Sequence, residues 1–376
     1  MRTKSFLLAL LLASSVTAFG QNATVTTKAS PGLLQLAGSG IDGQILVSAN
    51  DSWGVIRAAQ DLANDFGKVT GTNLTLERPA RRGPQWVGWG GWNGPPHPPN
   101  GSEAPPPSSE HNKTAGLPAS RETTVYYTYN PTTNYINMSV ADRLKNTVGP
   151  AQNFTGPILV SNSTRKTVII VGTIGKSDVI DALVVAQKIS DLPIHGKWES
   201  YIAHVVDNPF PGIDRAFVIA GSDMRGTIYG IYDVSEQIGV SPWWWFADVP
   251  IKKAEGVWAL GGRKTQCSPS VKYRGFFIND EQPTLTNWIN DNYALGPYGP
   301  GFNHYFYARV FELLLRLKAN YFWPAEWSSM FNVDDLANQP LADAYGIVMG
   351  SSHTEPMMRA SNEWPTFGSQ YGGNGQ

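Results

Sequence analysis

The chain has 376 residues, of which 41% are hydrophobic and 16% charged, a composition typical of a globular protein with about two domains. Its formal net charge of -1 argues against binding to nucleic acid or to an acidic membrane surface, because both require a concentrated positive charge. The 13 Trp, 15 Tyr and 15 Phe residues predict an aromatic core, and a Trp-rich cleft that stacks on sugars is a second interpretation of them.

The first 20 residues have the features of a cleaved secretory signal peptide. Arg2 and Lys4 precede a short apolar stretch, and Ala18 and Gly20 supply the small residues that a signal peptidase reads. The apolar stretch is shorter than the roughly 20 residues of a membrane-spanning helix, and no later segment reaches that length. We therefore expect a secreted, extracellular protein that does not span a membrane.

Eight glycosylation sequons support this interpretation. Each has the pattern Asn-x-Ser/Thr without a central Pro. All lie in the first half of the chain, at Asn22, Asn50, Asn73, Asn100, Asn112, Asn137, Asn153 and Asn162. The single cysteine, Cys267, excludes an intrachain disulfide, so the fold must depend on a large core and the thiol is expected to be buried.

Residues 21–250 predict an N-terminal α/β sandwich-like domain. Residues 44–49 form an apolar run typical of a strand. Residues 52–71 have apolar residues at helical spacing, with Ser52 as N-cap and Gly67 and Gly71 near the exit. Residues 78–122 are dense in Pro, Gly and Ser, which indicates an exposed and largely irregular insertion.

The rest of this domain alternates strands with helices, the pattern of a layered α/β fold. Strands are predicted at 166–173, 199–206 and 215–223, and helices at 179–189 and 224–240. The stretch VGTIGKS (171–177) is not a phosphate-binding loop, because Ile170 stands where the first Gly of that motif is required. Ser-Pro ends the last helix and is followed by the run Trp243–Trp245. Three consecutive Trp side chains cannot all face one way, so some are expected to pack under this domain and others to line whatever lies beside it.

Residues 251–376 predict the first units of an incomplete (β/α)8 TIM barrel. Strands are expected at 271–280, 319–327 and 347–359, and helices at 302–320 and 341–346. The inward residues expected on the first helix are Tyr307, Val310, Phe311, Leu314, Leu315 and Leu317. Polar residues follow each strand, as in barrels whose site is built by the loops after the strands. Only about three of the eight units are present, and an open barrel exposes strand edges, so we expect a truncated chain.

The polar residues at these strand ends form a candidate rim. They are Asn279, Asp280 and Glu281 on the first strand, Asn320, Trp323 and Glu326 on the second, and His353 and Glu355 on the third. Acids and amides suit sugar hydroxyls, an indole suits a ring face, and paired carboxylates suit acid–base hydrolysis. His353 and Glu355 lie on one face of a strand and could instead hold a metal or form a structural pair, but no HExxH motif accompanies them.

Several stretches resemble the xylan α-1,2-glucuronidases of glycoside hydrolase family 115. They are KYRGFFINDEQP, LKANYFWPAEW and LADAYGIVMGSSHTEPMMRASNEW, while GSDMRGTIYGIYDVSEQIGVSPWWWFADVP resembles the domain that precedes the barrel in that family. The resemblance implies an α/β domain packed on a (β/α)8 barrel. It also implies inverting hydrolysis of the bond between (4-O-methyl-)glucuronic acid and xylose in glucuronoxylan or its oligosaccharides. One carboxylic acid protonates the leaving oxygen and a second carboxylate activates water, without a metal or organic cofactor.

The resemblance also implies roles for single residues. Glu281 is the candidate catalytic carboxylate, and Asp280 is either a second one or the structural partner that fixes a loop. Residues implied to bind the sugar are Asn279, Asn320, Trp323, His353 and Glu355, with Arg225 and Trp243–Trp245 from the first domain. Family members continue well beyond Gln376 and carry part of their acid–base machinery on later strands. Formation of a homodimer by the full-length protein is an alternative that the sequence does not decide.

Other functions stay open as well. A non-catalytic secreted protein would bind plant cell-wall glycans through the Trp-rich rim without cleaving them. An inactive truncated fragment would neither bind nor cleave glycans. A barrel glycosidase of the β-hexosaminidase type would share the preceding α/β domain and differ in its substrate.

Overall fold

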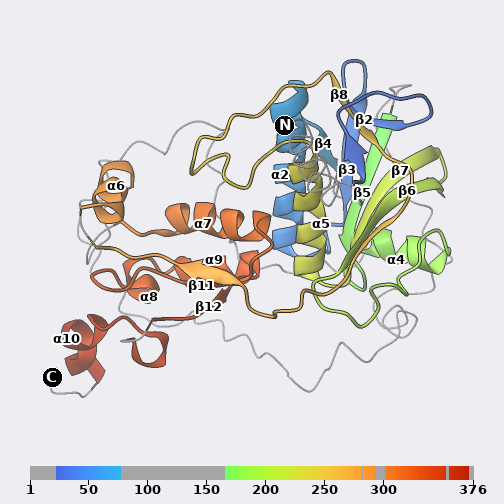
Figure 1. Ribbon diagram of the computed structural model, residues 1–376. Coiled ribbons are helices and arrows are strands. Elements are labelled where there is room, and N and C mark those ends of the chain that lie inside the picture. The colour runs from blue at the N-terminus through green and yellow to red at the C-terminus, as the bar shows by residue number, and fades with distance from the viewer. Residues whose placement is uncertain (1–22, 78–165, 282, 294–300, 353–354, 372–376) are drawn as a thin grey trace, which may run out of the picture. The chain divides into compact units, whose positions relative to one another are not determined.

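The computed structural model describes residues 23–77, 166–281, 283–293, 301–352 and 355–371 (Figure 1). These residues form two compact units, which divide between Ser270 and Val271. The predicted signal peptide and the insertion predicted at 78–122 lie outside the described residues. Within the described ranges, no helix has the length and apolar character needed to cross a membrane.

The first unit is built on a six-stranded sheet with the order β4-β3-β5-β7-β6-β9. Its strands are β3 (Asp42–Val47), β4 (Thr75–Glu77), β5 (Lys166–Thr173), β6 (Tyr201–Phe210), β7 (Ile213–Gly221) and β9 (Lys264–Gln266). β3, β4, β5 and β7 are parallel, whereas β6 is antiparallel to both of its neighbours. A smaller antiparallel sheet places β8 (Gly256–Ala259) between β1 (Val25–Thr26) and β2 (Leu34–Gly38).

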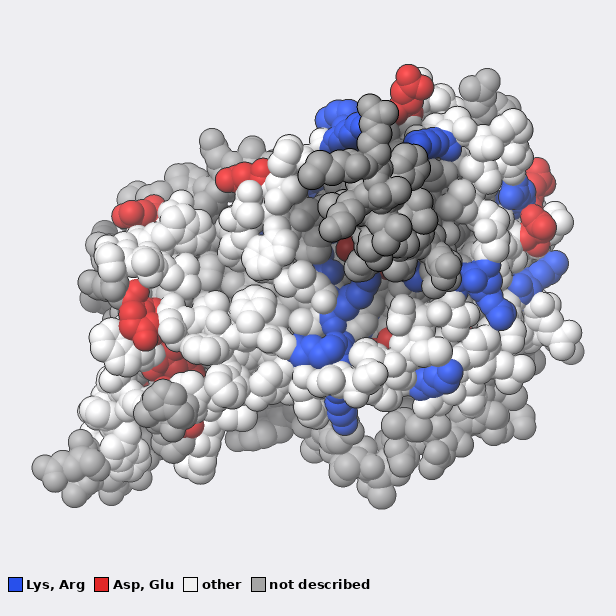
Figure 2. Space-filling model, in the orientation of Figure 1, with Lys and Arg blue, Asp and Glu red and all other residues white. Residues whose placement is uncertain are grey.

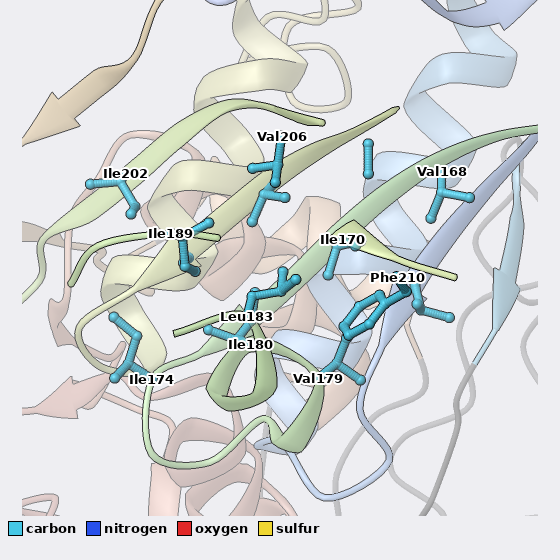
Figure 3. Packing of buried hydrophobic residues seen from close by; sticks show 14 of the residues in the cluster. Val168, Ile170, Ile174, Val179, Ile180, Leu183, Ile189, Ile202, Val206 and Phe210 are labelled. Carbon is cyan, nitrogen blue, oxygen red and sulfur yellow. The ribbon is translucent and has the colours of Figure 1, made fainter. Parts of the chain in front are cut away.

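Helices cover both faces of the larger sheet. Successive strand residues point to opposite faces, and one face packs Ile170, Ile202 and Val206 against Ile180 and Leu183 of α4 (Asp178–Val185) (Figure 3). The other face packs against α5 (Met224–Gln237), which lies beside α2 (Trp53–Thr70) (Figure 1). This approach is close, because a Cβ on Gly230 of α5 would come within 2.7 Å of the Ile219 side chain.

A buried polar cluster joins α2 to α5. Arg57 donates to Asp61 Oδ2 at 2.5 Å and to the Tyr232 hydroxyl at 2.7 Å, and that hydroxyl donates to the same Asp61 oxygen at 2.5 Å. We expect Tyr232→Phe to destabilise the first unit by about 1–3 kcal/mol, because hydrogen bonds to charged groups in a buried site are among the stronger ones. Urea unfolding followed by circular dichroism measures this. An unchanged midpoint would show that the hydroxyl contributes nothing to the packing of the two helices.

The predicted elements of this unit are largely confirmed. The strands expected at 44–49, 166–173, 199–206 and 215–223 and the helices expected at 52–71 and 224–240 are all present. Gly71 ends α2 with a φ of 89° and donates its N–H to Gly67 O, whereas Ser52 occupies the N-cap position without a side-chain cap bond. The helix expected at 179–189 stops at Val185, and Gln187 already has a φ of 55°.

Two expectations about the end of this unit differ from the structure. β8 pairs with β1 and β2, and β9 pairs with β6, so these strands extend the first unit to Ser270, whereas the sequence suggested a boundary at Ile251. The prediction that Cys267 is buried was wrong. The thiol is exposed because it follows the short edge strand β9, and its Sγ lies 3.7 Å from Lys197 Nζ.

The second unit contains a three-stranded parallel sheet with the order β10-β11-β12. The strands are β10 (Gly275–Phe277), β11 (Tyr321–Trp323) and β12 (Val348–Met349), all shorter than predicted. Between them in the chain lie α6 (Leu285–Asn292), α7 (His304–Arg316), α8 (Phe331–Asp334) and α9 (Asn338–Tyr345), followed by η4 (Pro356–Met358), α10 (Glu363–Phe367) and η5 (Gly368–Tyr371). The mixed α/β class is therefore confirmed.

Aromatic side chains form the core of this unit. The Phe322 ring at the centre of the sheet lies 5.6 Å from that of Phe276, 6.1 Å from that of Tyr307 and 6.0 Å from that of Phe311. The inward face predicted for α7 is confirmed except at Leu317, which is 39% exposed because the helix ends at Arg316.

Candidate functional site

The candidate rim lies at one edge of the second unit's sheet. Because β10, β11 and β12 are parallel, their carboxyl ends meet at that edge, and Phe277 pairs in register with Trp323 there. The segments that leave these ends carry Asp280, Glu326 and Glu355, all buried. Figure 2 shows carboxylate side chains gathered on the visible face over the region of α8.

Asp280 is a structural anchor between two segments of the rim. It is 0% exposed. Its Oδ1 accepts the Trp327 N–H at 3.0 Å, and its Oδ2 accepts the N–H groups of Ser328 and Ser329, each at 2.7 Å. The hydroxyls of Ser328 and Ser329 donate to Oδ2 as well, at 3.1 and 2.7 Å. Five donors saturate this carboxylate, so the structure favours the loop-fixing alternative for Asp280 over a catalytic one.

These donors also control the ionisation of Asp280. Burial alone would raise the pKa of a carboxyl group, but the hydrogen bonds from Ser329, Ser328 and Trp327 outweigh burial and hold the pKa of Asp280 below its usual value. The group therefore stays a carboxylate through the mildly acidic range, as its anchoring role requires.

Glu281 and Asn279 flank Asp280 and are both exposed. No hydrogen bond or ion pair joins the Glu281 carboxylate to the described residues. Asp280 anchors the backbone next to Glu281, while the Glu281 side chain is exposed to solvent. The Glu281 carboxylate can therefore reach a bound sugar or a water molecule. The structure therefore leaves Glu281 available for the role that the sequence predicted.

Asn320 does not lie at the rim, where the sequence had placed it. It precedes β11 and sits at the amino end of the sheet, fully buried. Its Nδ2 donates to Lys272 O at 2.7 Å, and its Oδ1 accepts the Arg274 N–H at 3.0 Å. The amide satisfies the backbone at the entrance of β10, because β11 begins two residues later than the strand predicted from the sequence.

Trp323 does lie at the carboxyl end of β11 and is partly exposed. Its indole N–H donates to the Tyr321 hydroxyl at 2.9 Å, which fixes the ring orientation. Its ring centroid lies 5.8 Å from that of Phe277, which is 51% exposed. Two adjacent and partly open aromatic rings at a strand end are suited to contact the apolar face of a sugar.

Glu326 carries the feature that sequence reasoning underrated. The pattern WPAEW suggested a rim carboxylate, but the side chain is only 5% exposed and its Oε2 has no hydrogen-bond partner among the described residues. Burial, followed by the charges of Glu355 and Glu363, raises the pKa of Glu326 to about 8. The only signal in the sequence was the position of Glu326 between the apolar residues Ala325 and Trp327. Alternation along a strand did not predict from this position that the side chain is buried.

The segment after β12 adds further carboxylates. Glu355 is buried and accepts a hydrogen bond from the Ser352 hydroxyl, and Arg359 donates to Glu363 Oε2 at 2.6 Å. His353 lies outside the described residues, so its predicted role stays a prediction. Within the described ranges, no group of His, Cys, Asp and Glu side chains is arranged to hold a metal ion.

Asp334 is a second buried acid near these groups. It is 7% exposed, and its Oδ2 accepts the Met330 N–H at 2.7 Å. Burial, which the Met330 bond only partly offsets, and the charges of Asp280 and Glu363 raise the pKa of Asp334 to about 7. It was not among the residues singled out from the sequence.

The predicted contributors from the first domain are described within the first unit alone. Arg225 Nε lies 2.6 Å from Oε1 of the buried Glu199, at the start of α5. Trp244 lies under Lys68, whose Nζ is 4.0 Å from the ring centroid, and Trp243 is 43% exposed. Their predicted approach to the sugar therefore stays a prediction.

Comparison with known proteins finds similarity to one family. A model of glycosyl hydrolase family 115 matches residues 266–375, which include all three strand ends of the rim. Among solved structures, a family 115 4-O-methyl-α-glucuronidase with specificity for decorated arabinogalactans is 27% identical, with a TM-score of 0.54. That match covers 86% of this chain and 30% of the other, so this chain spans about 30% of its length. A search of curated proteins gives no significant match.

The family match and the structural likeness agree with the resemblance of the rim motifs. Residues 266–375 match glycosyl hydrolase family 115, and the chain is similar to a solved structure of that family.

Proposed function

We propose that the protein is a secreted glycoside hydrolase that removes (4-O-methyl-)glucuronic acid side chains from glucuronoxylan and its oligosaccharides. The observation that carries this proposal is the family match over residues 266–375, which contain Glu281, Trp323 and the buried acids at one edge of a parallel sheet. The neighbour of similar structure is a 4-O-methyl-α-glucuronidase, which supports the same sugar.

The proposed architecture is the first part of a (β/α)8 barrel. The parallel order β10-β11-β12, with helices between the strands, supports it. In such a barrel the segments after the strands surround the substrate, and the rim described above occupies that position.

The proposed mechanism is inversion by two carboxyl groups. One protonates the oxygen that links the uronic acid to xylose, while the other activates a water molecule on the opposite face of the sugar ring. Glu281 is the candidate within this chain, because its carboxylate is exposed beside the anchored Asp280. Neither step uses a metal or an organic cofactor.

Secretion is part of the proposal. The first 20 residues have the pattern of a signal peptide. Two of the predicted glycosylation sites, Asn50 and Asn73, are described, and both are exposed. Exposure is what attachment of a glycan to these side chains requires.

A second candidate substrate is a decorated arabinogalactan, since the structural neighbour is specific for that class. Both substrates carry the uronic acid on a neutral backbone, so the residues that bind the uronic acid need not differ between them. A non-catalytic glycan-binding protein is the remaining alternative, and Phe277 and Trp323 would serve it equally well.

A substrate panel distinguishes these functions. The purified protein is incubated with glucuronoxylan, with decorated arabinogalactan and with a β-N-acetylhexosaminide, and released uronic acid or sugar is quantified. Release from glucuronoxylan is the expected result. Release from arabinogalactan alone would replace the proposed substrate. Binding without release would identify a glycan-binding protein.

A further inference from the structure

Glu326 lies where three segments of the second unit are tied together. The N–H of the next residue, Trp327, donates to Asp280 after β10. The carbonyl oxygen of Trp327 accepts a hydrogen bond from Asn362 Nδ2 at 3.0 Å, immediately before α10. The backbone of the residue that follows Glu326 is therefore fixed by hydrogen bonds to two other segments.

The charges that face Glu326 are mostly negative. Glu355 after β12, Glu363 on α10 and Asp280 after β10 all oppose its ionisation, and only Arg359 favours it. Arg359 is bound to Glu363 and half exposed, so its charge offsets only part of the group. An ionised Glu326 would be a buried carboxylate that has an oxygen without a hydrogen-bond partner in the described part of the chain and that is repelled by three other carboxylates. A neutral carboxylic acid avoids both costs.

We propose that Glu326 is a positioning residue whose neutral carboxylic acid lets the segment after β11 pack beside the acidic segment after β12. Through the shared anchor Asp280 it thereby keeps Trp323 and Glu281 in the arrangement that receives the sugar. Ionisation of Glu326 adds a negative charge to this group, separates the segments and loosens the rim. The effect on sugar binding rests on the proposed function, whereas the effect on the rim does not.

The direction of the pH dependence follows from the environment of the group. The pKa of Glu326 is raised from 4.5 to about 8, first by burial and then by Glu355 and Glu363. A raised pKa means that the ordered rim is favoured while the group is protonated. This contribution is fully present below the ordinary value near 4.5 and is lost as the pH rises through about 8.

A titration without ligand tests the positioning role. Trp327 is 66% exposed and directly follows Glu326, so its indole reports on this segment. We expect the tryptophan fluorescence of the wild type to show a transition near pH 8, and that of Glu326→Gln, which has the same shape and no charge, to lack it. Asp291→Asn, on the exposed part of α6, is the matched control and should keep the transition. A transition that persists unchanged in Glu326→Gln would overturn the proposal.

A second variant guards against misfolding of the first. Glu355→Gln removes the largest opposing charge, so the transition should move to lower pH while remaining visible. A transition that keeps its midpoint in this variant would contradict the proposed coupling between the two segments.

Sugar affinity gives an independent readout. For a xylo-oligosaccharide that carries 4-O-methylglucuronic acid, wild-type affinity should fall about tenfold for each pH unit above the midpoint, because one ionisation is involved. The affinity of Glu326→Gln should stay level over the same range. If the wild type binds this ligand at no pH, the proposed function fails, and the fluorescence titration still decides the positioning role.

Discussion

Replacement of Asp280 by Asn is expected to destabilise the second unit by about 1–3 kcal/mol, the cost of leaving a buried hydrogen-bond donor without its acceptor. The Asp280 carboxylate accepts five hydrogen bonds from Trp327, Ser328 and Ser329. In either orientation, the amide would point an N–H group at backbone N–H groups that are already donors. Urea unfolding of the second unit, followed by aromatic circular dichroism, measures the loss.

The exposed Asp291 on α6 is the matched control, and Asp291→Asn should change the unfolding free energy by no more than about 0.5 kcal/mol. The contribution of Asp280 also has a pH signature. Its pKa is lowered from 3.8, so its stabilisation is present above that value and is lost as the pH falls through the folded-state pKa. Asp280→Asn should lack this acid-sensitive part. An Asn variant as stable as the wild type would contradict the anchoring role.

The second large effect is expected at Glu281. Glu281→Gln should lower kcat by roughly 100-fold or more and leave the affinity for a glucuronoxylo-oligosaccharide nearly unchanged. The amide keeps the size and the hydrogen bonds of the side chain but cannot exchange a proton in the reaction. Because Glu281 is exposed and does not hold the fold together, the variant should unfold at the wild-type urea concentration.

Steady-state kinetics and calorimetric titration of the same preparation separate the two effects. Asp291→Asn again serves as the control for loss of one exposed carboxylate. If Glu281→Gln keeps the wild-type kcat, Glu281 is not one of the two catalytic carboxyl groups, and both must be supplied by other residues. A parallel loss of affinity would make Glu281 a sugar-binding residue instead.

Periodicity in the sequence predicted the helices that bury a regular stripe. α2 and α7 carry apolar residues every three or four positions, and Gly71 ends α2 in the left-handed conformation that favours glycine. α6 escaped prediction because its sequence, LTNWINDN, buries only Thr286 and Ile289. Short edge strands such as β9 escaped for a similar reason, since three residues are too few to show alternation.

The edge of the sheet that carries the rim could be predicted, but the environment of each residue could not. Asn320 and Trp323 were assigned to one strand end, yet β11 has only three residues and the two side chains lie at its opposite ends. Asp280 and Glu281 are adjacent carboxylates in the sequence, and hydrogen bonds from a segment more than 40 residues away decide which one is buried. Such long-range contacts leave no trace in local spacing. The unusual pKa of Glu326 has the same origin.

A time course of the reaction by proton NMR tests the central claim most directly. The wild-type protein is mixed with a xylo-oligosaccharide that carries one α-1,2-linked 4-O-methylglucuronic acid, and the anomeric signals are followed. The account predicts release of the uronic acid, with its β-anomer appearing before the α-anomer as inversion requires. Binding of the oligosaccharide without any release would contradict hydrolysis and identify a protein that holds the decorated glycan without cleaving it.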